Sequence, residues 1–307
     1  MSRCLGFTPV SMLSKAISGS RLRIIAYHDV PDPDTFAQQL EILRRWFQPV
    51  GSEEVLASIC HGRKLPRGAI WLTFDDAYPA VFEAGLDLLE EYDFPATVLV
   101  CPSVVDTDQP YWWQVIEEAV ATGVPIPLAA GSRNDLAVLG ELKRMPDEER
   151  REVVAAVSSE LGRRNGSRLA RPQVTREALD RWLASGRDVG NHTWDHPCLD
   201  TCATQEQDRQ IRWADTWLRE ELSIEPTAFA FPNGNITRVA HQTLDRLGYP
   251  LRLTFDHRLA RAKSRNLSRL RLDADAPIER VRAVTSGAHS FAFAARQRLV
   301  AYRLNDG

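Results

Sequence analysis

Short apolar runs alternate along the chain with longer segments in which apolar residues recur at helical spacing. The short runs predict β-strands over residues 22–27, 70–74, 96–100, 188–191, 228–231, 252–255 and 267–272. Between the first two, Phe36, Leu40, Leu43 and Phe47 lie three or four positions apart, which is typical of one buried helix face. The alternation predicts an α/β fold in which helices cover a parallel sheet.

Residues 111–171 interrupt this alternation, because they combine helical periodicity and polar turns with no strand-like run. We predict a helical insertion there, whose Arg- and Glu-rich part, residues 147–164, exposes a charged helix face. The rest of the chain divides into an N-terminal extension (residues 1–21), an α/β body (residues 22–275) and a C-terminal helical segment (residues 276–307). No repeat or flexible linker requires a second domain.

Composition excludes several classes of protein. Of the 307 residues, 44% are hydrophobic and the net charge is −3, so the chain can bury a full core and has no global attraction to nucleic acid. The longest apolar runs fall far short of the roughly 20 residues that a membrane span needs.

Residues 1–23 lack the apolar core of a secretory signal, and five scattered cysteines fit reduced thiols. We therefore expect a cytoplasmic protein, or one peripheral to the membrane.

Two adjacent carboxylates, Asp75 and Asp76, follow the strand predicted at residues 70–74. The carboxyl ends of parallel strands face the ligand side in α/β folds, so acids there can reach a common centre. Another predicted strand is followed by His192 and His196, which can bind one metal ion if their segment turns helically. Each feature alone has a structural alternative: a turn in which Asp76 caps the next helix, and a pair of surface or packed histidines.

Together these residues predict a hydrolytic metal site. Two imidazoles and the Asp76 carboxylate, with one position left open, form the donor set of a hydrolytic divalent-metal centre. Asp75 remains free to act as general base on an activated water. A third segment, residues 229–234, runs from a strand into a Pro/Gly turn. That turn either presents backbone N–H groups to the site or is an ordinary strand-to-helix turn.

In order and spacing, these segments resemble the motifs of the polysaccharide deacetylase family, also called the NodB-homology family or carbohydrate esterase family 4. Residues 73–76 are similar to its T-F-D-D motif, residues 191–197 to its H-[ST]-x-x-H-P motif, and residues 229–234 to the F-x-[YF]-P-x-G form of its third motif. Residues 26–30 resemble the first-strand Y-H-x-V of the branch that modifies exopolysaccharides. The resemblance extends from about residue 22 to residue 275.

The resemblance implies a distorted (β/α)7-type barrel that carries the helical insertion. It also implies a hydrolase of linear amide C–N bonds (EC 3.5.1.-), which removes N-acetyl or another acyl group from an amino sugar in a polysaccharide, glycolipid or sugar conjugate. The implied cofactor is a divalent metal, with Zn²⁺ expected and Co²⁺, Ni²⁺ or Mn²⁺ able to fill the same ligands. The implied roles are Asp75 as general base, Asp76, His192 and His196 as metal ligands, and the backbone near Pro232 and Asn233 as oxyanion stabiliser.

Three departures from the family pattern bear on the mechanism. Ala77 stands where the family usually has Gly, and a methyl group fits there only if φ is negative. Arg269 occupies the Arg position of the branch's N-x-L-P-R pattern and is our candidate to orient the base; an exposed basic residue is the alternative. The sequence has no convincing L-x-H motif to supply the general acid. His28, after the first strand, is the best replacement by position, against a plain strand-end histidine.

Other features leave their alternatives open. Seven basic residues against one acid between residues 252 and 271 form either a solvated loop or a cationic lip for an anionic sugar. Trp112 and Trp113 either pack the first helix of the insertion or stack on sugar faces. Two further functions stay open at this stage: a catalytically silent carbohydrate-binding relative and a deacylase of a small N-acylated metabolite.

Overall fold

The computed structural model describes residues 19–128, 135–166, 168–261 and 264–287 of the chain. Their strands form one sheet in the order β7-β6-β5-β4-β3-β1-β8, with β2 pairing on β3, and every strand pair is parallel. The strands are β1 (Arg23–Tyr27), β2 (Gln48–Pro49), β3 (Ala69–Asp75), β4 (Ala96–Val100), β5 (Asp188–Asn191), β6 (Ala228–Ala230), β7 (Leu251–Leu253) and β8 (Leu270–Arg271).

The sheet curls toward a barrel. Leu253 at the end of β7 forms a parallel bridge with Leu267, in the segment that leads into β8, and β8 pairs with β1. The predicted α/β barrel is therefore confirmed, and each of the seven predicted strands is present. Four of them are shorter than predicted, most of all the last, and β2 was missed because two residues carry no periodicity.

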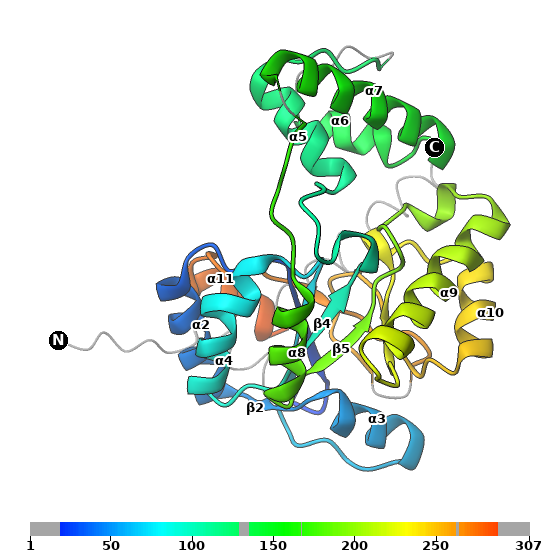
Figure 1. The fold of residues 1–307 in the computed structure, drawn as a ribbon. Coiled ribbons are helices and arrows are strands. Elements are labelled where there is room, and N and C mark those ends of the chain that lie inside the picture. Colours follow the sequence, from blue (N-terminus) through cyan, green and yellow to red (C-terminus); the bar gives the residue numbers. More distant parts are fainter. Residues whose placement is uncertain (1–18, 129–134, 167, 262–263, 288–307) are drawn as a thin grey trace, which may run out of the picture.

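Helices cover the outer side of the barrel, and one of them, α3 (Ser52–His61), lies across the end opposite the insertion (Figure 1). They are α2 (Pro33–Trp46), α3 (Ser52–His61), α4 (Leu86–Glu91), α8 (Arg176–Ala184), α9 (Thr204–Glu221), α10 (Arg238–Leu247) and α11 (Ile278–Thr285). Local signals set their ends: Asp32 caps α2 by accepting a hydrogen bond from the Thr35 N–H, and Gly248 ends α10 at φ 80°. No helix within the described ranges is both long and apolar enough to cross a bilayer.

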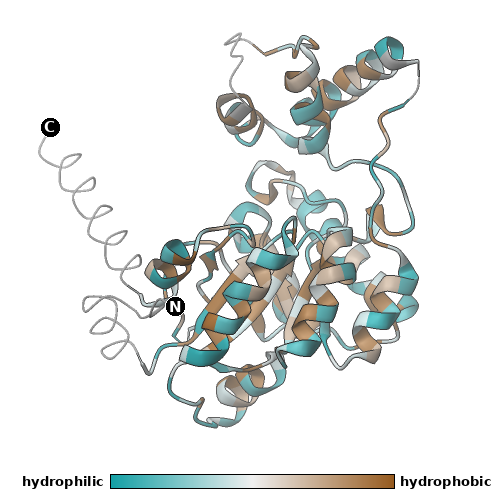
Figure 2. Ribbon diagram, turned by 90° about the vertical axis from the view of Figure 1, so that its left-hand side faces the viewer, coloured by the Kyte–Doolittle hydropathy of each residue, from teal (hydrophilic) through white to brown (hydrophobic). Residues whose placement is uncertain are grey.

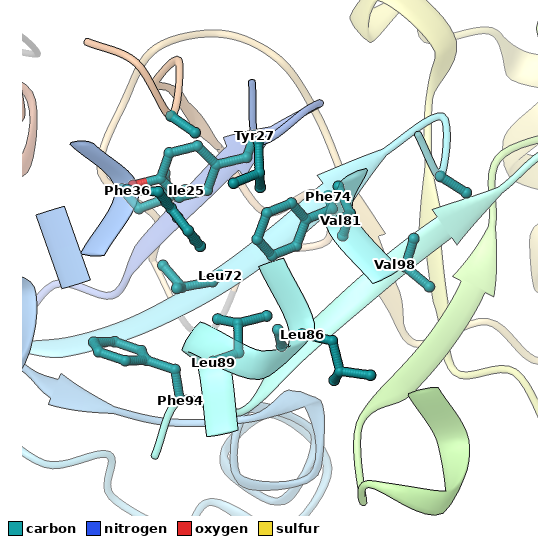
Figure 3. Close-up of a cluster of buried hydrophobic side chains, with 14 of the residues drawn as sticks. Ile25, Tyr27, Phe36, Leu72, Phe74, Val81, Leu86, Leu89, Phe94 and Val98 are labelled. Carbon is teal, nitrogen blue, oxygen red and sulfur yellow. The ribbon is translucent and has the colours of Figure 1, made fainter. Parts of the chain in front are cut away.

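The main core lies between the sheet and the helices that cover it. Tyr27, Phe36 and Phe74 are fully buried, and the Tyr27 ring lies 5.5 Å from each of the other two (Figure 3). Apolar residues line the sheet and the inner faces of the helices, while polar residues face outward (Figure 2). Truncating one of these rings to Ala would cost about 3–5 kcal/mol of stability. The barrel is thus a rigid support for the side chains at its rim.

The insertion forms a separate layer of helices, α5 (Trp112–Thr122), α6 (Asp135–Leu142) and α7 (Asp147–Asn165), which stands beyond the strand ends (Figure 1). It has a small core of its own, in which Ile116, Leu142 and Leu161 are fully buried. Of the terminal segments expected from the sequence, residues 1–18 and 288–307 lie outside the described residues. The described part of the C-terminal segment carries α11.

Candidate functional site

Asp76, His192 and His196 meet where β3 and β5 end; we call them the ligand cluster. The Nε2 atoms of His192 and His196 lie 3.5 and 3.6 Å from Asp76 Oδ1, and the possible ligand atoms of all three residues lie within 4.8 Å of one another. All three side chains are buried. Residues from two strand ends, over 100 positions apart in the sequence, therefore point at one centre.

The hydrogen bonding of the ligand cluster fits a divalent cation. His192 Nδ1 lies 2.9 Å from the Ala230 carbonyl oxygen, so Nδ1 carries the proton and the Nε2 lone pair faces Asp76. Burial lowers the pKa of both histidines, which keeps them neutral, as metal ligands must be. Asp76 Oδ1 is buried without a hydrogen-bond partner. Burial and the adjacent Asp75 carboxylate raise the Asp76 pKa. A cation would offset both the cost of burying the Asp76 charge and its repulsion by Asp75.

The two loops that present the ligands contain strained backbone. Asp76, Ala77, Thr193 and His196 have φ values of 67°, 51°, 71° and 58°, in the left-handed region that costs a residue other than Gly about 1 kcal/mol or more. The condition for tolerating Ala77, a negative φ, is therefore not met, and this position carries backbone strain that the family's usual Gly avoids. Strain of this kind persists only where surrounding contacts hold the loop in place.

Asn191 supplies such contacts to the second loop. Its Oδ1 accepts a hydrogen bond from the Thr193 N–H at 2.8 Å, while its Nδ2 donates to the Ile211 carbonyl and the Tyr249 hydroxyl, both at 3.1 Å. The side chain is fully buried, so the loss of these bonds would leave polar groups unpaired. Asn191 thereby fixes the turn between the two histidines.

Arg269 holds Asp75 beside the ligand cluster. Its Nη1 and Nη2 donate to the two carboxylate oxygens at 2.6 and 2.7 Å, and Nη1 also donates to Thr73 Oγ1 at 3.1 Å. Burial, the largest influence, acts to raise the Asp75 pKa, but Arg269 and more weakly His192 hold it well below its ordinary value. Asp75 is thus an oriented carboxylate that is ionised in the resting protein, and the exposed-edge alternative for Arg269 is wrong because its side chain is buried.

The insertion reaches back to both ligand loops. Tyr111 donates its hydroxyl proton to the Asp76 carbonyl at 2.9 Å, and the Trp112 indole N–H donates to the His196 carbonyl at 3.2 Å. Arg151 on α7 makes two hydrogen bonds to the Asp195 carboxylate, at 2.8 and 3.1 Å. Tyr111 and Arg151 were missed from the sequence, since their partners lie 35 and 44 positions away and no local pattern connects them.

A pocket of about 830 Å³ opens over the ligand cluster, between the barrel rim and the insertion. Asp75, Arg269, His28 and Asn233 line it from the barrel, whereas Pro232 is buried and does not line it. Burial lowers the pKa of His28 to about 4, so its imidazole is neutral near pH 7 in the metal-free protein. The structure thus brings the sequence-predicted residues to one pocket, with Pro232 just behind its wall.

The structure also places the two tryptophans and the basic stretch that the sequence left open. Trp113 lines the pocket with its ring 4.6 Å from that of His196, while Trp112 packs and bonds beneath the ligand loop. The basic stretch does not form a continuous cationic lip, because Arg252 and Arg265 both pair with Asp245 at 2.6 Å. In the described part of that stretch, Arg269 and Arg271 line the pocket; Lys263 lies outside the described residues.

Comparison with known families identifies the family. The family model for polysaccharide deacetylase matches residues 62–251, more than half of the chain. The chain belongs to the polysaccharide deacetylase family. The matched region contains Asp75, the whole ligand cluster and the turn at Asn233, so the predicted family and hydrolase class are confirmed at the level of the family.

Curated relatives of this family member are deacetylases of amino-sugar polymers. The poly-β-1,6-N-acetyl-D-glucosamine N-deacetylase of Escherichia coli K12 is 23% identical over 220 residues, which are 70% of this chain and 29% of that protein. Chitin deacetylase 1 of Cryptococcus neoformans is 35% identical over 72 residues, 23% of this chain and 14% of that one. The chain therefore spans less than a third of the length of these relatives.

Solved structures share the architecture. The Streptococcus pyogenes deacetylase PplD, solved in complex with acetate, superposes with a TM-score of 0.61 at 18% identity and covers 86% of this chain and 98% of its own. IcaB from Ammonifex degensii gives a TM-score of 0.60 at 17% identity, covering 87% of this chain and 98% of its own. At this level of identity the similarity establishes the fold.

Proposed function

We propose that the protein is a metal-dependent hydrolase that removes the N-acetyl group from an amino sugar in a glycan or glycoconjugate. One observation carries the proposal: a buried, ionised carboxylate, Asp75, lies fixed by Arg269 beside an Asp/His/His cluster in the floor of a large open pocket. Two curated relatives are named as a poly-β-1,6-N-acetyl-D-glucosamine N-deacetylase and a chitin deacetylase, which favours an N-acetylglucosamine polymer as substrate.

Asp76, His192 and His196 would hold the cofactor, for which Zn²⁺ is the first expectation and Co²⁺, Ni²⁺ and Mn²⁺ fit the same donors. When bound, a cation supplies Lewis-acid catalysis and lowers the pKa of a coordinated water. The protein's own contribution is to hold the ligands in place. The Ala230 carbonyl fixes the His192 tautomer, and the insertion bonds to the Asp76 and His196 backbones.

Asp75 accepts the proton of the attacking water in this proposal. Arg269 bonds to both of its oxygens, yet each oxygen keeps a further lone pair that can receive a proton. The water oxygen then attacks the acetamide carbonyl carbon, the C–N bond breaks, and the products are acetate and a free amine. The backbone at Asn233, whose φ of 54° turns the chain at the pocket wall, would stabilise the developing oxyanion in this proposal.

The leaving amine needs a proton, and His28 stays our candidate to assist the transfer of that proton. His28 lines the same pocket and lies within electrostatic reach of Asp75. Because burial favours its neutral form, His28 would donate a hydrogen bond to the amine while the proton taken up by Asp75 returns to the leaving group. This assignment predicts that replacement of His28 slows amide substrates more than activated acetate esters, whose leaving groups need no proton.

The test is acetate release from N-acetylated glycan oligomers, nucleotide sugars and small N-acetyl metabolites by the zinc-loaded protein. We expect release that disappears on chelation and in Asp75→Asn, with the glycan oligomers as the best substrates. If a small N-acetyl metabolite were the best substrate, the proposed glycan substrate would be wrong and the metabolite would take its place. Absence of release from every compound, with one zinc bound per chain, would contradict the proposal and favour the silent binding relative.

A further inference from the structure

A second surface on the barrel has the chemistry of a sugar-binding site. Trp194, Trp213 and Trp217 line a groove of about 240 Å³ together with Thr216, Glu220 and Glu221; we call it the tryptophan groove. Trp213 is 48% exposed, and in the described ranges only Leu136 and Ile236 join it as exposed large hydrophobic side chains. An indole left in water costs free energy, so a ligand that covers it gains affinity.

The tryptophan groove lies on the side of the ligand-carrying loop that faces away from the pocket. Trp194 lies between His192 and His196 in the sequence, but its ring packs edge-on against Trp213, with 5.8 Å between the ring centroids. The two histidines face the pocket, whereas Trp194 belongs to the lining of the groove. The groove lies against α9, on the outer side of the barrel (Figure 1), and the loop that carries His192 and His196 separates it from the pocket.

The groove combines flat aromatic faces with negative charge at one end. Trp213 and Trp217 are four residues apart on α9, a rise of about 6 Å that is comparable to the size of one sugar ring. Arg209 stacks over the Trp213 ring at 4.7 Å, a cation–π contact of the kind that an ammonium group can also make with an indole. Glu220 is exposed and has no ion-pair partner within the described residues, while Glu221 lies 3.7 Å from Arg176.

We propose that the tryptophan groove binds the deacetylated stretch of the glycan. The apolar C–H face of a glucosamine ring stacks on Trp213, and the ammonium group made by deacetylation lies near Glu220. This inference rests on the proposed function, because hydrolysis of the acetamide creates that ammonium. The groove would retain the product end of a polymer beside the pocket and favour repeated action on one chain.

The experiment measures binding of two soluble oligomers to the zinc-loaded full chain by calorimetry. One is a glucosamine oligomer and the other is a cellulose oligomer of equal length, which has the same ring faces and no amine; neither carries an acetyl group to be hydrolysed. We expect Trp213→Ser to weaken the glucosamine oligomer about 5- to 30-fold and Trp213→Phe to weaken it less. Glu220→Gln should weaken the glucosamine oligomer alone.

Ile236→Ser is the matched control, because Ile236 is exposed to a similar extent, 45%, and does not line the groove. Unchanged affinity in Trp213→Ser, or an equal loss in Ile236→Ser, would overturn the proposal. Equal affinity of the wild type for the two oligomers would also overturn it, since the ammonium groups would then contribute nothing to binding. If sedimentation shows instead a dimer that Trp213→Ser dissociates, with oligomer binding unchanged, the groove is a contact between copies and the proposal is wrong.

The two proposals fail in different ways. Acetate release from an N-acetylglucosamine trimer tests the pocket, and Trp213→Ser should leave that rate within about twofold because Trp213 does not line the pocket. A wild type that releases no acetate but binds the glucosamine oligomer through Trp213 would refute the enzymatic proposal and leave the groove as a binding site. Normal turnover with unchanged oligomer binding in Trp213→Ser would refute the groove alone.

Discussion

The barrel wall and the insertion wall of the pocket hold the site by different means. The barrel supplies charged side chains that are completely buried, and the Asp75–Arg269 pair fixes both members with two hydrogen bonds. The insertion supplies single hydrogen bonds from Tyr111 and Trp112 to backbone carbonyls of the ligand loops, and a partly exposed ion pair between Arg151 and Asp195. The barrel thus sets the protonation and direction of reactive groups, while the insertion sets the position of strained backbone.

This difference predicts which property of the protein a substitution in each wall should change. A buried charge without its partner is costly, so damage to the barrel wall affects folding and chemistry at once. A lost hydrogen bond to a loop carbonyl costs about 1 kcal/mol and permits small displacements of the metal ligands. We therefore expect barrel variants to lose turnover and stability, and insertion variants to lose mainly metal affinity.

The largest effect should come from breaking the ion pair of the barrel wall. Arg269→Met leaves the Asp75 carboxylate buried and unpaired, and we expect the free energy of unfolding to fall by about 3–5 kcal/mol. Acetate release should fall about 10²–10⁴-fold, the contribution of a general base that is no longer oriented. Denaturant unfolding and steady-state rates measure both. A loss of stability below about 1 kcal/mol would contradict the importance given to the pair.

The double variant Asp75→Asn/Arg269→Met sharpens that result. It removes both charges, so no uncompensated buried charge remains, and we expect it to recover part of the stability lost in Arg269→Met. Turnover should stay at the level of Asp75→Asn, since the base is absent. A double variant as unstable as Arg269→Met would show that packing of the Arg269 side chain, rather than its charge, stabilises the rim.

A smaller effect is expected from the insertion wall. Trp112→Phe removes the N–H donor to the His196 carbonyl, and we expect zinc affinity to fall about tenfold. The matched control is Trp113→Phe, because the Trp113 indole N–H bonds to the Tyr78 hydroxyl at 3.2 Å and not to a ligand loop. Competition with a zinc chelator measures both affinities. Equal losses in the two variants would remove the special role assigned to Trp112.

The smallest effect should come from Ala77→Gly. Gly accepts the φ of 51° without strain, but the change also removes a buried methyl group and loosens the unfolded chain, so stability should change by less than about 1 kcal/mol. We expect acetate release within about threefold of the wild type. An inactive wild type that gains turnover in Ala77→Gly would instead identify Ala77 as the cause of a silent site.

The sequence was sufficient for the parts that depend on local pattern. Apolar runs located the barrel strands, and motif spacing brought Asp75, Asp76, His192 and His196 to one rim because parallel strands end on the same side. The pairing of Arg269 with Asp75 could be anticipated only from a resemblance, since 194 positions separate the two residues. The cytoplasmic location stays a prediction.

What escaped prediction depends on long-range folding. Tyr111, Trp112 and Arg151 act on the ligand loops only because the insertion folds back over the rim, and helical periodicity does not encode that direction. The left-handed conformation of Ala77 is imposed by the loop around it, against its own preference. Local sequence thus specifies the reactive groups better than the contacts that hold them.

One crossed measurement tests the division between the two walls most directly. Arg151→Met removes the double hydrogen bond to Asp195 in the ligand loop, and Asp75→Asn removes the base; zinc affinity and the rate at saturating zinc are measured for both. The account predicts zinc affinity up to about tenfold weaker with nearly normal turnover in Arg151→Met, and normal affinity with turnover lost in Asp75→Asn. Normal zinc affinity in Arg151→Met, or normal turnover in Asp75→Asn, would contradict it.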